Sequence, residues 1–480
     1  MNKNYLISSG RTELIKRIES KIGIPEILIT VESKQDLYIN RFEWLKLING
    51  DYGHFDWSKI PPVDSDLLDN MGKCERIFLK MSERNFSTAS YQFRKDLYIK
   101  HLRFWNFKLD LGIEFAIFEN IPHEGFDFII YELCKRKSIK TLCFYTLPVR
   151  PFQSVLMHSF SDLYNPGQEI KETYNNLFLK YIDDQDEISK IPISDYLLNY
   201  YKEHDKDSES IISFTRAEVK NLYKTIKKIQ IKKNTFRLIR ALSKLKFRKT
   251  LNSIIINLYR DSYFENETVV EDFYNRFVVD PEFDRTFIYF PLHFQPEGST
   301  SPIGGNYVDQ ALVCEMLSWV VGPDILIYVK EHPRSSKVDY IRNVAFYERL
   351  LLCKNVKFLN RNYNSYNLID KSMAVATVTG SAGWESFLRR KPVFMFGSRF
   401  YESAPGIFKI YSIDDLKEAF KIVSNTVNLI SSNQILLYLK SLESHVFEGY
   451  IAECDSKIAT VSREESDEKI SDIVNEFVNK

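Results

Sequence analysis

Polar side chains that could bind or activate a ligand follow apolar, strand-like runs at three places in the chain. The first run is followed by His293, Gln295 and Glu297, and the second by Lys330, Glu331 and His332. In open α/β sheets, ligands bind outside the carboxyl ends of the strands. The spacing therefore predicts a ligand-binding edge of a parallel sheet.

The third run leads into Thr379, Gly380 and Ser381, and then into a segment with helical spacing that carries Glu385. Small residues allow close approach of the backbone, and a helix amino terminus offers free N–H groups and a positive dipole end to a phosphate. Glu385 could accept hydrogen bonds from ribose hydroxyls. In the alternative, Ser381 only caps the helix and Glu385 faces solvent. The neighbouring strand ends favour the phosphate site.

His332 is followed by Pro333, which biases the histidine toward an extended backbone. An imidazole can donate a hydrogen bond to a phosphate oxygen. With Lys330 and Arg334 close by in the sequence, the strand end is a candidate anion site. The alternative is an ordinary loop histidine.

The residues after the first run could read sugar hydroxyls: His293, Gln295 and Glu297, with Ser299 behind them. Pro and Gly are dense here, so a surface turn is the alternative.

An earlier segment has the pattern strand, loop, helix, strand over residues 115–145, with His123, Glu124 and Asp127 between the first strand and the helix. A carboxylate in such a loop could be a general base. The residues alone favour the plainer role of acids in the first helical turn.

The bulk composition bounds the class of protein. The chain has 480 residues, 44% hydrophobic residues and 65 Lys and Arg against 64 Asp and Glu. This length predicts at least two domains, and the net charge of +1 indicates no polyanionic partner for the chain as a whole.

Several motifs are missing from the sequence. The six cysteines form no C-x-x-C pair, and there is no H-E-x-x-H and no Walker A sequence. We therefore expect reduced thiols and no metal site. The absence of a signal-like or bilayer-spanning apolar segment predicts a soluble cytoplasmic protein.

Residues 216–249 carry thirteen Lys or Arg and a single acid, with apolar residues at near-helical intervals. A basic amphipathic helix suggests docking on an anionic membrane surface. A packed pair of helices between the domains fits equally well. Because no nucleic-acid-binding module is recognisable, we expect no nucleic-acid partner.

The resulting organisation is α/β. We predict an amino-terminal Rossmann-like domain over residues 1–192, a helical basic insertion over 193–275, a second Rossmann-like domain over 276–412 and carboxyl-terminal helices over 413–480.

The motifs FPLHFQPEGSTSPIGG, VKEHP and TVTGSAGWESFLRRKPVFMFG together resemble bacterial capsule polysaccharide biosynthesis proteins, the group that contains the β-Kdo transferases. They resemble more distantly the His-Pro motif of bacterial sialyltransferases. The resemblance covers about residues 110–145 and 283–410.

The resemblance implies a GT-B glycosyltransferase, with two Rossmann-like domains facing a cleft. It implies an inverting transfer of a CMP-activated ulosonic acid, such as Kdo or sialic acid, to a glycan or lipid-linked glycan acceptor. No metal ion and no cofactor would be needed. The enzyme would work in the cytoplasm, and residues 216–249 would dock it on the inner face of the plasma membrane.

The resemblance also implies residue roles. The family's His-Pro motif falls on His332 and Pro333, which would contact the CMP phosphate. Its phosphate-binding turn falls on Thr379, Gly380 and Ser381.

The acid of the following helix falls on Glu385, the implied ribose contact, and the acid-Gly motif of the first domain falls on Glu124 and Gly125. The related transferases have an acidic pair before that glycine, whereas here His123 precedes Glu124. The base is therefore Glu124, His123 or Asp127.

Two alternatives remain open. One is a transferase that uses another donor: a UDP-sugar, a GDP-sugar or CDP-glycerol. The other is a non-catalytic assembly protein at the membrane surface that keeps a degenerate transferase fold.

Overall fold

The computed structural model describes eight parts of the chain: residues 3–31, 41–86, 89–147, 155–181, 191–204, 267–294, 300–333 and 342–480. The basic segment 216–249 lies outside the described residues, as do Gln295, Glu297 and Ser299.

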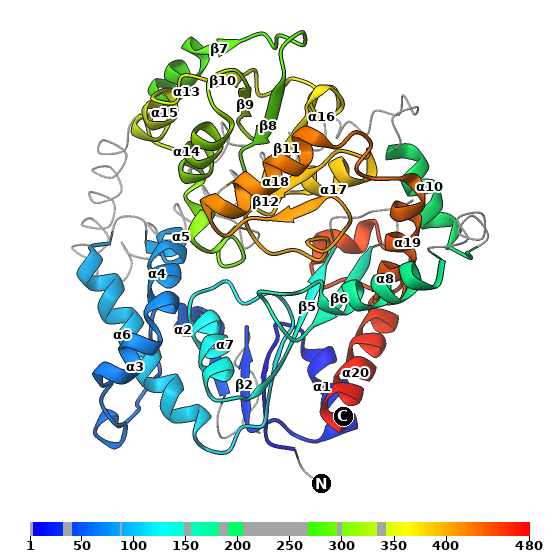
Figure 1. Cartoon of the computed structure of the whole chain (residues 1–480). Helices are drawn as coiled ribbons and strands as arrows, with labels where there is room; N and C mark the ends of the chain where they lie inside the picture. Colours follow the sequence, from blue (N-terminus) through cyan, green and yellow to red (C-terminus); the bar gives the residue numbers. More distant parts are fainter. Residues whose placement is uncertain are drawn as a thin grey trace.

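Two seven-stranded sheets organise the molecule (Figure 1). The first has the order β14-β6-β5-β4-β1-β2-β3, and the second has the order β13-β12-β11-β8-β9-β10-β7. All pairs in the second sheet are parallel, and in the first sheet only the pairs β5–β6 and β6–β14 are antiparallel. The predicted α/β class, with two Rossmann-like sheets as in GT-B proteins, is confirmed.

The strands of the first sheet are β1 (Tyr5–Ser8), β2 (Ile27–Thr30), β3 (Arg41–Glu43), β4 (Phe115–Phe118), β5 (Lys140–Thr146), β6 (Leu156–Phe160) and β14 (Val446–Glu448). Those of the second sheet are β7 (Val278–Val279), β8 (Phe287–Pro291), β9 (Leu326–Lys330), β10 (Val356–Leu359), β11 (Ala374–Thr377), β12 (Val393–Met395) and β13 (Ile407–Lys409).

The helices up to the second sheet are α1 (Thr12–Ile22), α2 (Trp44–Ile48), α3 (Ser65–Asn70), α4 (Gly72–Met81), α5 (Glu83–Phe86), α6 (Tyr91–Leu109), α7 (Phe126–Arg136), α8 (Gln168–Tyr181), α10 (Asp195–His204) and α13 (Glu267–Arg276). They are followed by α14 (Gln310–Val321), α15 (Val344–Leu351), α16 (Ser365–Lys371), α17 (Ser381–Leu388), α18 (Ile413–Asn425), α19 (Ser432–Glu443) and α20 (Arg463–Asn479).

The central strands of the second sheet are buried and mainly apolar. β9 reads LIYVK and β11 reads AVAT, and both are buried at every position, with the polar residue last in each. Continuous apolar runs are typical of parallel strands buried on both sides. The polar residues therefore begin where each strand leaves the sheet.

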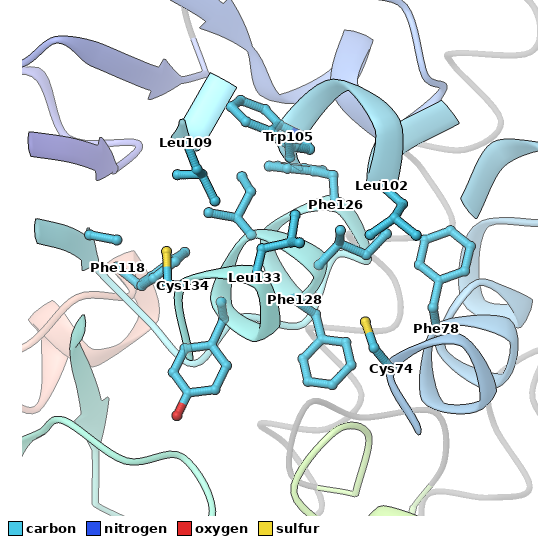
Figure 2. Packing of buried hydrophobic residues seen from close by; sticks show 14 of the residues in the cluster. Cys74, Phe78, Leu102, Trp105, Leu109, Phe118, Phe126, Phe128, Leu133 and Cys134 are labelled. Atoms are coloured by element: carbon cyan, nitrogen blue, oxygen red, sulfur yellow. The ribbon is translucent and has the colours of Figure 1, made fainter. Parts of the chain in front are cut away.

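Helix α7 is fixed in the core of the first domain, where Phe126 and Phe128 are fully buried (Figure 2). Gly125 precedes the helix with φ 95°, and a Cβ atom there would lie 3.0 Å from the ring of Phe78. Only glycine adopts this conformation readily and leaves room for the ring. The loop before α7 consequently has a defined position.

The end of the chain returns to the first domain. α18 packs on α14, whereas α20 packs against α1 (Figure 1). Lys21 of α1 forms ion pairs with Glu468 and Asp472, each at 2.6 Å. Residues 413–480 thus comprise helices and the short strand β14, and they connect to both sheets.

Within the part of the chain that the structure describes, no helix is both long enough and apolar enough to cross a bilayer.

Candidate active site

The carboxyl edge of the second sheet gathers the predicted polar residues. β12, β11, β8 and β9 are neighbours in that order. The chain that leaves them carries Arg399 after β12, Thr379 after β11, His293 after β8 and His332 after β9. Residues far apart in sequence therefore meet along one edge.

The turn after β11 is held by hydrogen bonds to its backbone. The N–H of Thr379 donates to Nε2 of His293 (3.0 Å), and the N–H of Gly380 donates to Oγ1 of Thr377 (3.0 Å). The carbonyl of Thr379 accepts a hydrogen bond from Nε of Arg399 (2.8 Å). The turn is thus rigid before any ligand binds.

Gly380 is required by space rather than by its backbone angles. A Cβ atom on it would lie 3.0 Å from His293 Nε2 and 3.0 Å from Thr377 Oγ1.

Helix α17 begins at Ser381, and Gly380 is its N-cap residue, without a side-chain cap. The alternative in which Ser381 caps the helix is therefore wrong. Ser381 is exposed in the first turn. Its hydroxyl and the N–H groups of that turn are the groups that such a helix offers to an anion.

His293 is a buried, neutral imidazole. Burial lowers its pKa to about 3, and the charges of Arg399 and Arg342 act in the same direction. Since Nε2 accepts from Thr379, the neutral ring carries its proton on Nδ1, which has no hydrogen-bond partner among the described residues. The sugar-binding role of His293 stays a prediction, as do those of Gln295, Glu297 and Ser299.

Glu331 fixes the backbone of the His-Pro motif. Its Oε1 accepts from Nη1 of Arg342 (2.6 Å) and from the N–H of His332 (2.9 Å). Its Oε2 accepts from the hydroxyl of Tyr347 (2.6 Å). His332 itself is half-buried, with its ring 5.7 Å from that of Phe294, and Pro333 is exposed.

Lys330 is buried, and its Nζ donates to the carbonyl of Tyr363 (2.9 Å) and to Oγ of Ser365 (2.6 Å). Burial lowers its pKa to about 8, against an opposing effect of the Glu385 carboxylate. Glu385 is half-buried, so the alternative in which it faces solvent is wrong. Burial raises the pKa of Glu385, and Ser381 and Lys330 oppose this shift.

In the first domain, Asp127 shapes the loop before α7. Its Oδ1 accepts from the N–H groups of Glu124 (2.8 Å) and Phe128 (2.7 Å), and its Oδ2 accepts from that of His123 (2.9 Å). Burial raises the pKa of Asp127 to about 6. Both carboxylate oxygens are therefore engaged by the loop.

Glu124 is half-buried, with Oε1 3.4 Å from Nε2 of His123 and 3.7 Å from Nη1 of Arg84. Nδ1 of His123 donates to the carbonyl of Ile121 (2.5 Å), which orients the ring with Nε2 toward Glu124. Glu124 and His123 thus form an adjacent pair. The identity of the base stays a prediction.

The two domains meet at a cavity beside this loop. Its lining includes Ile121 and Tyr145 from the first domain, and Ile303 and Arg399 from the second. The guanidinium of Arg399 lies over the ring of Tyr145, 4.8 Å from its centroid. The strand ends of both sheets therefore face one inter-domain region.

Two polar residues that follow strands, Arg399 and Glu119, were not among the predicted site residues. Arg399 is described above. Glu119 follows β4 and accepts hydrogen bonds from Oγ of Ser9 and from the N–H of Gly10 (2.9 Å). The run FMFGSR before and at Arg399 has the same strand-to-polar pattern as the predicted sites and could have revealed it.

The described residues contain no group of three or more His, Cys, Asp or Glu side chains that could hold a metal ion.

Three of the solved structures that match this chain cover most of it. KpsC, a β-Kdo 2,7 transferase of Thermosulfurimonas dismutans, is 12% identical, with coverage of 82% of this chain and 96% of that chain, at a TM-score of 0.32. A glycosyltransferase of Rickettsia africae is 13% identical over 100% of both chains at a TM-score of 0.27. UDP-GlcNAc 2-epimerase of Methanocaldococcus jannaschii, in complex with UDP-GlcNAc and UDP, is 12% identical over 92% of this chain and 100% of that chain, at a TM-score of 0.25.

Among curated proteins, no sequence matches this chain. Residues 309–421 match the family described as "Capsule polysaccharide biosynthesis protein". The matched range contains the His-Pro motif, the turn after β11 and helix α17. The family that the motifs of this chain resemble therefore matches it over residues 309–421.

Proposed function

We propose that this chain is an inverting glycosyltransferase of surface polysaccharide biosynthesis. Its donor is a CMP-activated ulosonic acid, such as Kdo or sialic acid, and its acceptor is a glycan or lipid-linked glycan. One observation carries the proposal: the pre-formed turn at Thr379 and Gly380, followed by the uncapped start of α17, lies on the same sheet edge as His332. A helix amino terminus at the carboxyl edge of a parallel sheet is a favourable site for a nucleotide phosphate.

The first domain supplies the second half of the reaction. Glu124 takes the proton of an acceptor hydroxyl, and the oxygen attacks the anomeric carbon of the donor sugar. A carbon–oxygen bond forms as the bond between that carbon and the phosphate oxygen breaks, and CMP leaves with the electron pair. Attack on the side opposite to CMP inverts the anomeric configuration.

Negative charge grows on the CMP phosphate during this step. His332 donates a hydrogen bond to it, and the Ser381 hydroxyl and the first-turn N–H groups of α17 stabilise it further. Glu331 supports this role because its Oε1 accepts a hydrogen bond from the backbone N–H of His332 across 2.9 Å, which fixes the backbone there. Glu385, half-buried one turn into the same helix, accepts hydrogen bonds from the ribose hydroxyls.

The direct test incubates the purified chain with CMP-Kdo and with CMP-sialic acid while CMP release is measured. We expect release from one of these donors, stimulated by a glycan acceptor. Addition of EDTA should leave the rate unchanged, because the proposed reaction uses neither a metal ion nor a cofactor.

A thermal-shift comparison of CMP, CDP, UDP and GDP tests the nucleotide. We expect CMP to raise the melting temperature most. A larger shift with UDP, GDP or CDP would contradict the proposed CMP-activated donor and favour the transferases that use another nucleotide. No shift with any nucleotide and no release of CMP would favour the non-catalytic assembly protein.

We also propose that residues 216–249 dock the enzyme on the anionic inner face of the plasma membrane, where a lipid-linked acceptor is presented. The thirteen basic residues of the segment support this. Cosedimentation with anionic vesicles should be strong at low salt and weak at high salt. Binding that is absent, or that ignores salt, would contradict docking.

A further inference from the structure

Arg399 is a buried cation that lacks an anionic partner. Its side chain is 7% exposed, and only Nε is engaged, by the carbonyl of Thr379 at 2.8 Å. Nη1 is buried without a hydrogen bond, and among the described residues no carboxylate forms an ion pair with Arg399. A buried, unpaired charge is costly. An anion supplied by a ligand would offset that cost.

The guanidinium is oriented before such an anion arrives. Tyr145 of the first domain lies under its face at 4.8 Å, and Thr379 holds its Nε. Nη1 is the nitrogen that is buried without a hydrogen-bond partner among the described residues. An arginine fork of this kind matches the two oxygens of a carboxylate or phosphate.

The surroundings strengthen an ionic contact. Arg399 lines the inter-domain cavity with Ile121, Phe160, Leu163 and Ile303, and among the residues of this lining only Arg399 carries a permanent charge. In such an apolar environment a hydrogen-bonded ion pair is stronger than in water.

Arg399 lies next to the proposed phosphate site but is not part of it. β12 is the neighbour of β11, whereas β8 and β9 lie on the other side of β11. The turn at Thr379 thus stands between Arg399 and His332. A ligand with a phosphate at this turn and a second anionic group next to it would engage both.

We propose that Arg399 binds the carboxylate of the donor sugar and thereby selects acidic sugars. This inference rests on the proposed function. In a CMP-ulosonic acid the carboxylate is attached to the anomeric carbon, which also bears the phosphate oxygen, so the two anions are adjacent. The β-phosphate of a nucleoside diphosphate sugar offers the same chemistry, and the experiment separates the two.

The test compares the affinities of CMP, CMP-ulosonic acids, UMP and UDP for the unchanged chain, Arg399→Lys and Arg399→Ala. Titration calorimetry without acceptor gives each dissociation constant. In Arg399→Lys the charge remains but the fork is lost. For both Arg399 variants we expect the affinity for the CMP-ulosonic acid to fall roughly 10- to 100-fold, while the affinity for CMP stays nearly unchanged. Arg463→Lys, at the exposed start of α20, should change neither affinity.

Equal losses for CMP and the donor would overturn the inference, because Arg399 would then act only through the turn at Thr379. Unchanged donor affinity in both variants would overturn it too. The variants could instead lose affinity for UDP but not for UMP, while their affinities for CMP and for the CMP-ulosonic acids change equally little. That result would assign Arg399 to a β-phosphate instead. If the unchanged chain binds none of these nucleotides, the proposed function itself fails, whatever the variants do.

Discussion

The backbone N–H of Thr379 donates to Nε2 of His293 across 3.0 Å, which joins the ends of β11 and β8. The neutral state of His293 is essential to this contact, since a protonated imidazole has no acceptor nitrogen. Burial keeps the pKa of His293 at about 3, so the bond persists at all physiological pH values. The first strand end therefore supports the turn after β11 directly.

The first prediction concerns Gly380→Ala. The new methyl group would lie 3.0 Å from His293 Nε2 and Thr377 Oγ1, so one of them must shift. Overpacking of this kind costs about 1–3 kcal/mol. We expect a lower melting temperature and a drop of roughly fivefold or more in CMP affinity by calorimetry.

The matched control is Gly72→Ala, where a Cβ atom meets nothing within 4 Å. Its stability should be unchanged or slightly raised, because alanine favours a helix. Equal behaviour of the two variants would contradict a tight turn at Gly380.

The second prediction concerns Glu331→Gln. This change removes the charge that pairs with Arg342 in the interior and weakens the acceptor of the His332 N–H. Breaking a buried pair costs about 3–5 kcal/mol when one partner is removed. We expect the free energy of unfolding, measured in urea, to fall by an amount near the lower end of this range. CMP release should also be slower.

Glu13→Gln provides the comparison, since Glu13 pairs with Lys16 on the surface. Exposed pairs contribute little, so the free energy of unfolding should stay nearly constant. A Glu331→Gln variant as stable as Glu13→Gln would exclude a structural role for the buried carboxylate.

The third prediction is a pH dependence through Lys330. Its pKa of about 8 means that the ammonium loses its proton between pH 7 and pH 9. If this charge supports the anion site, CMP affinity falls as the pH rises through 8. Lys330→Met should bind CMP weakly, without this step in its pH profile.

The free energy of unfolding depends on pH in a different way from the CMP affinity. The folded-state pKa of Lys330 lies below its ordinary value of 10.5, so the unfolded chain binds more protons between about pH 8 and 10.5. The contribution of Lys330 to stability therefore rises with pH in this window. Flat CMP affinity from pH 7 to 9.5 in the unchanged chain would exclude a charge role for Lys330.

Much of the second sheet's edge could be predicted because its signal is local. An apolar run that ends in polar residues marks a buried strand and its exit, and this applies to His293, Lys330 and Thr379. The alternative in which Ser381 caps α17 is wrong because the helix begins at Ser381 itself and Gly380 is its N-cap residue.

The remaining residues depend on contacts that are distant in sequence. Glu331 is structural because Arg342, Tyr347 and Tyr274 converge on it and its backbone. Arg399 gains its place from Thr379 and from Tyr145 of the other domain. No periodicity or spacing within one segment encodes such partners, so they emerge only when the strand order is known.

The last prediction tests the base. Glu124→Ala should lower acceptor-dependent turnover by about 10²- to 10⁴-fold, the usual contribution of general base catalysis, while CMP affinity persists. His332→Ala should also lower turnover strongly, but through the leaving group. Asp110→Ala, at an exposed ion pair with Lys137, is the acidic control and should be fully active.

Two further variants separate Glu124 from its neighbours. His123→Ala should retain more activity than Glu124→Ala if the imidazole only orients the carboxylate across their 3.4 Å contact. Asp127→Asn should disturb both, because Asp127 accepts the N–H groups of His123 and Glu124. A normal Glu124→Ala beside an inactive His123→Ala would transfer the base to His123. Near-normal turnover of both Glu124→Ala and His332→Ala would contradict the catalytic roles proposed for these two residues.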